Sequence, residues 1–224
     1  MSSDSHSGAD PRAATTLWAV VCACALSGMG AVAAGMGLAP GLKGRFLVAD
    51  RATELGGVLA ESRSRLDRVD ALREVEPLVA SVAGYVPTRS WRQVLLRDHV
   101  LVGLAADFLA RVETNLDASM LPSAGSFQPW LGVGTGVRVR WDEELATRLA
   151  EPGADLSTDS LFVRKLVGEV LSVAQRLAAV HPHLTAALTG AGSGELDDLD
   201  RINEVMAEAL SLHDERMVAL GLEP

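Results

Sequence analysis

The feature that most constrains this chain is an apolar stretch near its start. Residues 17–39 contain no Asp, Glu, Lys or Arg and consist mainly of Ala, Val, Gly, Leu, Met and Cys. These 23 residues are enough to cross the hydrocarbon core of a bilayer, which needs about 20 apolar residues in a helix. The stretch therefore predicts a hydrophobic helix that is either an export signal or a transmembrane anchor.

Two interpretations of this stretch follow from its surroundings. A short polar leader with Arg12 precedes it, and Ala31–Ala33 and Val32–Ala34 both fit the small-x-Ala pattern of signal peptidase sites. Lys and Arg are more frequent after the stretch than before it, which does not favour an anchor with its body outside. Glycines such as Gly28 and Gly35 interrupt the span, although glycines also occur where membrane helices pack together. A cleaved signal is the favoured prediction, and a retained anchor is the alternative.

The composition of the chain bounds what the remainder can do. The formal net charge of −9 argues against nucleic-acid binding, because contact with phosphates needs a cationic face. The only cysteines, Cys22 and Cys24, lie inside the apolar stretch, so the rest of the chain has no disulfide and no cysteine nucleophile. Residues 1–16 are polar and predict a disordered N-terminus. The chain after residue 34 is long enough for one domain with its own core.

Four amphipathic helices are predicted in the remainder of the chain. Apolar residues recur at three- and four-residue spacing over residues 46–76, 91–120, 157–180 and 195–217. Pro77 ends or kinks the first helix, Thr88 or Ser90 caps the second, and Ser193 caps the fourth. Because none of these helices can bury its apolar face alone, we predict an all-α antiparallel four-helix bundle over residues 46–220.

The connection between the second and third helices, residues 122–157, is rich in glycine and irregular. Within it, Val137–Trp141 alternates between apolar residues and arginines, which is typical of a strand in a small β-hairpin. Residues 142–150 predict a short helix capped by Asp142. The three glycines of the connection lack the preceding strand of a phosphate-binding loop and indicate a flexible loop; they are Gly132, Gly134 and Gly136.

The candidate catalytic and metal-binding groups lack the surroundings that such sites need. His181 and His183 could face one metal ion, but the Glu-x-x-His pairs typical of metal sites in helical bundles are missing. The acidic run 197–200 lacks the pattern of a calcium-binding loop, and no strand precedes Ser193 as in a nucleophile elbow. We therefore predict no enzyme activity and no catalytic, cofactor-binding or metal-binding residues. A small-ligand enzyme or binder that uses the two histidines is the alternative.

Three stretches resemble the PsbQ family, the four-helix extrinsic proteins on the lumenal side of photosystem II. Val79–Leu121, which opens its helix with Trp91 and closes on a Leu-Pro step, is similar to the second helix of the family. Leu161–Ala179 is similar to the third helix, and Ile202–Leu210 is similar to the last. The apolar N-terminal stretch with its small-residue end fits the thylakoid-targeting step that such proteins use.

This resemblance implies a non-catalytic role in the thylakoid lumen, at the membrane. The protein would dock on the photosystem II core and other extrinsic subunits and stabilise the oxygen-evolving complex, without a cofactor of its own. No docking residues carry over from the family, and we predict a contact surface from Arg89, Arg92 and Arg97 beside Trp91. The alternatives are an extracytoplasmic scaffold anchored in a bacterial membrane by residues 17–39, and a subunit of another large membrane complex.

Overall fold

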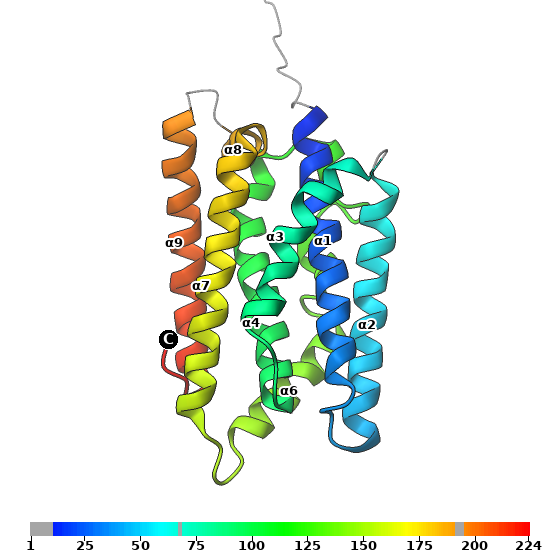
Figure 1. The fold of residues 1–224 in the computed structure, drawn as a ribbon, viewed down its shortest axis with the longest axis vertical. Helices are drawn as coiled ribbons and strands as arrows, with labels where there is room; N and C mark the ends of the chain where they lie inside the picture. Colours follow the sequence, from blue (N-terminus) through cyan, green and yellow to red (C-terminus); the bar gives the residue numbers. More distant parts are fainter. Residues whose placement is uncertain (1–10, 67–68, 191–194) are drawn as a thin grey trace, which may run out of the picture.

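The computed structural model describes residues 11–66, 69–190 and 195–224 (Figure 1). Across these residues the protein is 81% helix without strands, which confirms the predicted all-α class. The long helices are α1 (Pro11–Gly35), α2 (Gly41–Ser64), α3 (Asp70–Tyr85), α4 (Trp91–Val112), α6 (Gly136–Leu149), α7 (Leu156–Val180) and α9 (Glu195–Ala219). Shorter elements connect them: η1 (Glu113–Asn115), η2 (Ala118–Met120), α5 (Phe127–Trp130) and α8 (Pro182–Thr189).

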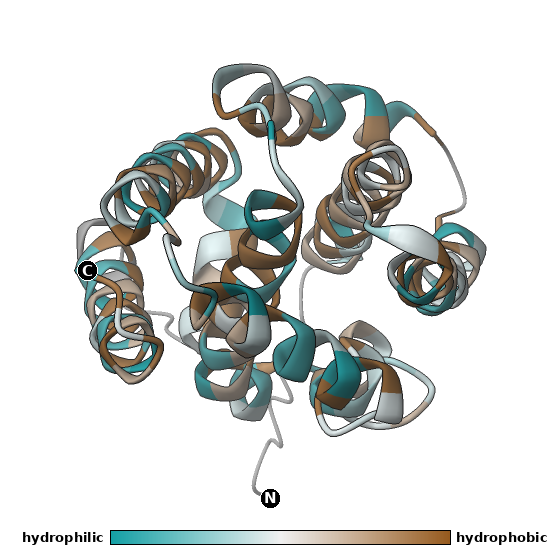
Figure 2. Ribbon diagram, turned by 90° about the horizontal axis from the view of Figure 1, so that it is seen from below, coloured by the Kyte–Doolittle hydropathy of each residue, from teal (hydrophilic) through white to brown (hydrophobic). Residues whose placement is uncertain are grey.

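The helix α4 lies at the centre of the molecule. It contacts α1, α6, α7 and α9, and the end-on view shows the other helices arranged around a central one (Figure 2). The largest apolar cluster is built around α4 and joins residues of α1, α2, α6, α7 and α9 to it. The bundle therefore contains more long helices than the predicted four, because α1 and α3 also belong to it.

The helix α1 packs inside the bundle along its length. Leu17, Trp18, Cys22 and Val32 are buried, and α1 lies mainly against α2 and α3. By length and composition it is the one described helix that could cross a membrane, with a mean hydropathy of 2.0 over 18 residues of which 39% are buried. Pro11–Thr16 already belong to it, so the predicted disordered N-terminus does not extend that far; residues 1–10 lie outside the described residues.

The glycines of α1 allow close approach to its neighbours. A Cβ atom at Gly35 would lie 2.6 Å from Cγ1 of Val94 on α4, and one at Gly28 would lie 3.5 Å from Leu55 on α2. The first distance is shorter than real side chains tolerate, so α1 and α4 can meet at this point only because residue 35 has no side chain. Gly35 therefore fits the helix-packing interpretation, whereas a Cβ atom at Gly30 would meet no atom within 4 Å.

The first predicted helix is divided into two. The helix α2 ends at Ser64 and α3 begins at Asp70, although the apolar spacing continues through the turn between them. Pro77 lies inside α3 and does not end it. The periodicity merged the two helices because Leu66 and Val69 continue the apolar spacing between them, although Val69 is exposed.

The predicted β-hairpin is wrong. Residues 137–141 form the start of α6, and the Oγ1 of Thr135 caps this helix by accepting the amide of Arg138 at 3.2 Å. Arg138 is buried in a polar network and Trp141 is fully buried in the core, so the arginines and apolar residues do not separate onto outer and inner faces.

Several predicted helix ends are confirmed. Ser90 caps α4, with its hydroxyl oxygen accepting the amide of Gln93 at 3.3 Å. The helix α7 ends at Val180, and Pro182 opens α8. The predicted cap at Ser193 lies outside the described residues.

Candidate functional site

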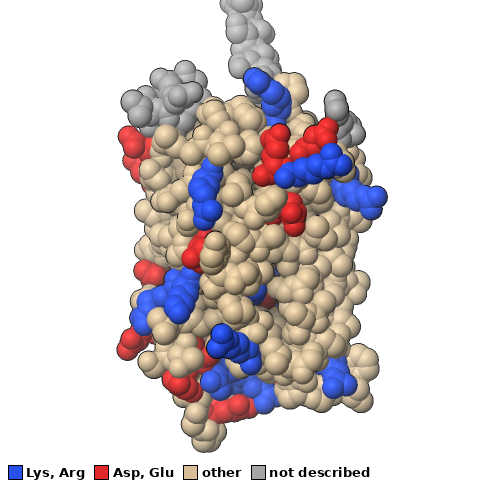
Figure 3. Space-filling model, in the orientation of Figure 1, with Lys and Arg blue, Asp and Glu red and all other residues tan. Residues whose placement is uncertain are grey.

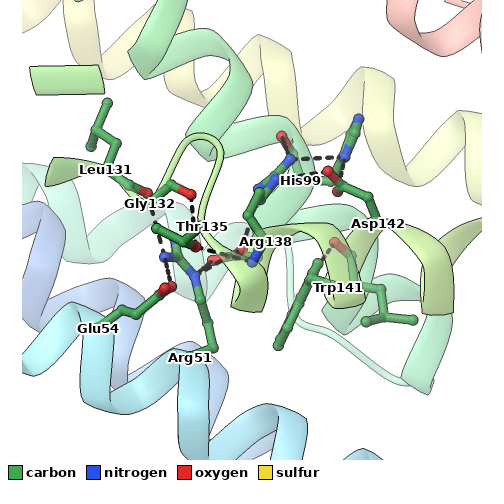
Figure 4. A network of polar contacts seen from close by, with 11 residues as sticks. Arg51, Glu54, His99, Leu131, Gly132, Thr135, Arg138, Trp141 and Asp142 are labelled. Atoms are coloured by element: carbon green, nitrogen blue, oxygen red, sulfur yellow. Dashed lines mark hydrogen bonds and ion pairs between the residues drawn. The ribbon is translucent and has the colours of Figure 1, made fainter. Parts of the chain in front are cut away.

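The interior holds a network of charged side chains where α2, α4 and α6 meet (Figure 4). Arg51 of α2 has only 2% of its surface exposed. Its Nε donates to both carboxylate oxygens of Asp98 on α4, at 3.0 and 3.1 Å, and its Nη1 donates to Glu54 at 3.0 Å. Burial alone lowers the pKa of Arg51, but the charges and hydrogen bonds of Asp98 and Glu54 outweigh it and raise the pKa. Arg51 is therefore a permanent buried cation.

The helix α6 brings a second guanidinium to the same place. Arg138 Nη1 lies 3.5 Å from Asp98, and Arg138 Nε donates to Asp142 at 3.0 Å. The Nδ1 atom of His99 lies 2.8 Å from Asp142 and 2.9 Å from Arg138 Nη2. This nitrogen can donate to Asp142 or accept from Arg138, but not both at once.

The carboxylate of Asp142 is held in its charged form. Burial acts to raise its pKa, but the hydrogen bond from His99 and the charge of Arg138 outweigh burial and lower the pKa. Asp142 therefore serves as an anion of the network and not as the cap of a helix beginning at that residue, because α6 begins at Gly136.

The glycine-rich loop before α6 closes the network. The carbonyl oxygen of Leu131 accepts from Arg51 at 3.4 Å, and Thr135 Oγ1 donates to the carbonyl oxygen of Gly132 at 2.9 Å. Gly132 has φ +87, and a Cβ atom there would lie 3.0 Å from Arg51 Nη1. The loop predicted to be flexible thus has a defined position over a buried cation, which only glycine allows at residue 132.

The network is suited to holding three helices in one register. Two guanidiniums face three carboxylates, of which Asp98 is buried and Glu54 and Asp142 are partly exposed. Buried ion pairs add little net stability over apolar residues of the same shape, but removal of one partner leaves a charge that water cannot reach. The lowered pKa of Asp142 also makes this carboxylate a weak proton acceptor. The arrangement therefore favours a structural role over acid–base chemistry.

A second polar contact joins α4 to α9. Arg216 Nη1 and Asp107 form an ion pair at 2.6 Å, and a Cβ atom at Gly103 would lie 3.0 Å from Arg216 Nε. His213 is buried beside them, and its Nδ1 has no hydrogen-bond partner among the described residues. Burial first, and then the charge of Arg216, lower the pKa of His213, so that it favours the neutral form.

The two histidines considered as metal ligands lie at the start of α8. The rings of His181 and His183 are edge to face, with centroids 5.7 Å apart, and His183 Nε2 lies 3.0 Å from the hydroxyl of Thr16 on α1. Among the residues described here, no three His, Cys, Asp or Glu side chains group closely enough to hold a metal ion. His183 therefore links α8 to α1 by a hydrogen bond.

The predicted docking residues do not share one surface. Trp91 is buried, and its Nε1 donates to Glu144 on α6 at 3.2 Å. Arg97 is also buried and donates to the carbonyl oxygen of Val86, and burial lowers its pKa. Arg92 is partly exposed and pairs with Asp159 at 2.6 Å, whereas Arg89 is exposed. Of the four residues, only Arg89 and part of Arg92 are accessible to a partner.

The network residues were not predicted from the sequence, although one signal was present. Three polar residues interrupt the apolar run of α4 between Leu96 and Val100: Arg97, Asp98 and His99. Charged residues at buried positions need partners, so this interruption indicates charges on a neighbouring helix. The identity of those partners, Arg51 and Arg138, depends on tertiary packing.

Comparison with known proteins adds no relative. No protein-family model matches the sequence, and no curated protein matches it. The resemblance to the PsbQ family therefore stays a prediction.

Proposed function

We propose that the protein is a non-catalytic, membrane-associated helical bundle that acts through its surfaces and keeps α1 as one of its bundle helices. The observation that carries this proposal is the position of α1. An apolar helix long enough to span a bilayer lies against α2 and α3, with part of its surface left open. This combination fits a peripheral membrane protein better than a soluble body behind a removable signal.

Cleavage at the candidate peptidase sites would remove part of the core. A cut near Ala34 would separate Leu17, Trp18 and Ala23 from the residues they pack against. The ring of Trp18, for example, contacts the rings of Phe127 and Trp130, with ring-centroid distances of 6.3 and 5.7 Å. The apolar sides of α2 and α3 would then face water, at about 25 cal/mol for each Å² exposed. This supports retention of the segment.

The buried ionisable groups support a structural role. The strongest candidates for chemistry are each paired with a guanidinium group, Asp98 in the interior and Asp142 at the partly exposed edge of the network. An open hollow between α7 and α9 is lined mainly by apolar and amide side chains, among them Gln175, Ile202 and Met206. Neither place gathers a nucleophile with a base.

A more specific form of the proposal is a PsbQ-like subunit on the lumenal side of photosystem II. Its support is the resemblance of three stretches, which fall on α3–α4, α7 and α9. In this form Arg89 and Arg92 belong to the docking surface. Its test is co-purification with photosystem II, which Arg89→Glu should weaken. The control is Arg176→Glu, which reverses the charge of an exposed residue of α7. Equal recovery of the two variants would show that Arg89 is not part of a docking surface. Arg92 is less suitable for this test, because its substitution also breaks the ion pair with Asp159.

The general proposal is tested by the mass and location of the native protein. Intact-mass measurement should give a chain that still contains α1, and fractionation should place it with membranes. High salt or alkaline carbonate should release it, because a peripheral protein has no spanning helix. A native chain that starts near residue 35, or one found entirely in the soluble fraction, would contradict the proposal.

A further inference from the structure

The end of the bundle at the α1–α2 turn presents large apolar side chains to solvent. Leu42 and Phe46, one turn apart at the start of α2, are 69% and 66% exposed, and Met36 and Leu38 precede them in the turn. Tyr85, at the end of α3, is 68% exposed. Exposed apolar residues are ordinary when scattered singly, but a group of them at one end marks a contact surface.

The connections that carry these side chains lie at the same end of the bundle (Figure 1). Ala39 of the α1–α2 turn and Val86 of the α3–α4 connection belong to one apolar cluster. The close approach of Gly35 to Val94 fixes the end of α1 against the start of α4. We refer to the exposed residues of the two connections as the apolar tip; they are Met36, Leu38, Leu42, Lys43, Arg45, Phe46, Tyr85 and Arg89.

The charges of the apolar tip are all positive in a chain of net charge −9. The side chain of Lys43 is 92% exposed and reaches Glu144 only at 3.8 Å. Arg45 and Arg89 are exposed and form no ion pair within the described part of the chain. Two acidic groups of α2 and α6 are already paired with arginines of α6, since Asp50 pairs with Arg140 at 2.7 Å and Glu144 with Arg148 at 2.8 Å.

In contrast to the tip, the adjoining surface over α1 and α2 carries few charges. In the half of α1 that leads to the tip, the exposed positions carry no charge; they are Cys24, Leu26, Gly30, Ala33 and Ala34, whereas the exposed Arg12 lies at the other end of the helix. Figure 3 shows a broad surface over α1 and α2 with few charged side chains, bordered by charged groups above and below. An apolar surface that ends in an aromatic and cationic rim has the composition of segments that sit in the interface of a bilayer.

We propose that the apolar tip inserts into the headgroup region of a membrane that contains anionic lipids. The proposal rests on the membrane association proposed above and names its partner. Leu42 and Phe46 would enter the boundary between headgroups and acyl chains, while Lys43, Arg45 and Arg89 contact lipid phosphates. Charge complementarity favours lipid over an apolar protein partner, because the exposed charges among these residues are all cationic and an anionic lipid surface offers phosphates across its whole area. The bundle remains folded, with α1 in its place.

The test is sedimentation of the purified full-length protein with vesicles. Vesicles of phosphatidylcholine with phosphatidylglycerol should bind the protein, and binding should weaken with added salt and with pure phosphatidylcholine. The Leu42→Ser, Phe46→Ser protein should bind about tenfold more weakly or worse. The Lys43→Glu, Arg45→Glu protein should lose a similar factor at low salt. All four side chains are exposed, so circular dichroism should show an unchanged fold.

Matched controls come from the far end of the bundle. Val180 at the end of α7 is 63% exposed, and Arg176 is exposed one turn before it. Val180→Ser and Arg176→Glu make the same chemical changes away from the tip and should leave vesicle binding unchanged. An equal loss in control and tip variants would overturn the tip as the site.

Two other results would also overturn the proposal. If the tip substitutions leave vesicle binding unchanged and alkaline carbonate does not extract the protein, α1 leaves the bundle and spans the bilayer. Failure to bind any vesicle, for a protein that fractionates with native membranes, would mean that a protein partner occupies the tip. The second result would contradict lipid binding by the tip but not the proposed membrane association. A native protein found only in the soluble fraction would contradict both.

Discussion

Two helix contacts of the same bundle are built on opposite chemistry. Where α2, α4 and α6 meet, the buried Arg51 and Arg138 are paired with the buried Asp98 and the partly exposed Asp142. Where α1 meets its neighbours, the contact is apolar and depends on small residues such as Gly35. Ion pairs fix which residues of α2, α4 and α6 face each other, whereas the position of α1 depends on how closely its apolar side chains fit against the neighbouring helices. The helix α1 is therefore held mainly by apolar packing, with two hydrogen bonds near its start, from Thr16 to His183 and from Trp18 to Ser119, and without a buried ion pair among the described residues.

The largest expected effect is at the charged contact. Asp98→Ala leaves the Arg51 guanidinium buried without its main partner, so the free energy of unfolding should fall by about 3–5 kcal/mol. Urea denaturation followed by circular dichroism measures this change. The matched control is Arg73→Ala, which breaks an exposed pair with Asp70 and should cost less than about 1 kcal/mol. Equal losses in the two variants would mean that the network is solvated.

The next effect separates the two sides of α1. Leu17 is 5% exposed and Leu26 is 45% exposed on the same helix. Leu17→Ala should destabilise the protein by about 2–5 kcal/mol, because it leaves a cavity next to α4, α8 and α9. Leu26→Ala should change stability by about 0.5 kcal/mol or less. If Leu17→Ala were as mild as Leu26→Ala in denaturant titrations, α1 would not be part of the core.

The glycines of α1 provide a smaller and sharper comparison. Gly35→Ala places a methyl group against Val94, and overpacking of this kind costs about 1–3 kcal/mol. Gly30 has open space around its Cβ position, so Gly30→Ala should stabilise the helix by about 0.5–1 kcal/mol. Thermal unfolding of the two variants should therefore shift in opposite directions. Shifts in the same direction would contradict the close contact between α1 and α4.

The smallest effect is a pH dependence of the α4–α9 contact. The pKa of His213 is lowered in the folded state by burial and by Arg216, with His99 adding to the effect and Asp214 and Asp107 opposing it. Unfolding then binds a proton as the pH falls below about 6.5, the ordinary pKa of histidine. Stability from this group is complete above that pH and is lost on acidification toward the folded pKa. His213→Gln should flatten this part of a stability curve measured from pH 7.5 to 5, and an unchanged curve would contradict the assignment.

Much of the helical architecture could be predicted from the sequence, because helix period and caps are local. Ser90 and the His181-Pro182 step marked real helix ends for this reason. The break between α2 and α3 and the helical state of residues 137–141 could not be predicted, because they depend on which side chains the tertiary fold buries. Arg138 illustrates this: as an exposed residue it fits a strand pattern, and as a partner of Asp98 it belongs to α6.

The candidate surfaces were harder to predict than the fold. Arg97 and Trp91 read as a contact surface in the sequence, but both are buried, since α4 lies at the centre of the bundle and most of its sides are covered. The sequence did not indicate that Leu42 and Phe46 are exposed, because apolar residues near the start of a predicted amphipathic helix are expected to belong to its buried face. Exposure is a property of the whole arrangement and not of the local pattern.

The most direct test of the account is hydrogen exchange in the native full-length protein, in the absence of membranes. If α1 is a bundle helix, the backbone amides of residues 17–25 should exchange about as slowly as those of the central helix α4, because both open only with the core. Rapid exchange across residues 17–25, with α4 still protected, would contradict the account and show that the apolar helix is separate from the bundle.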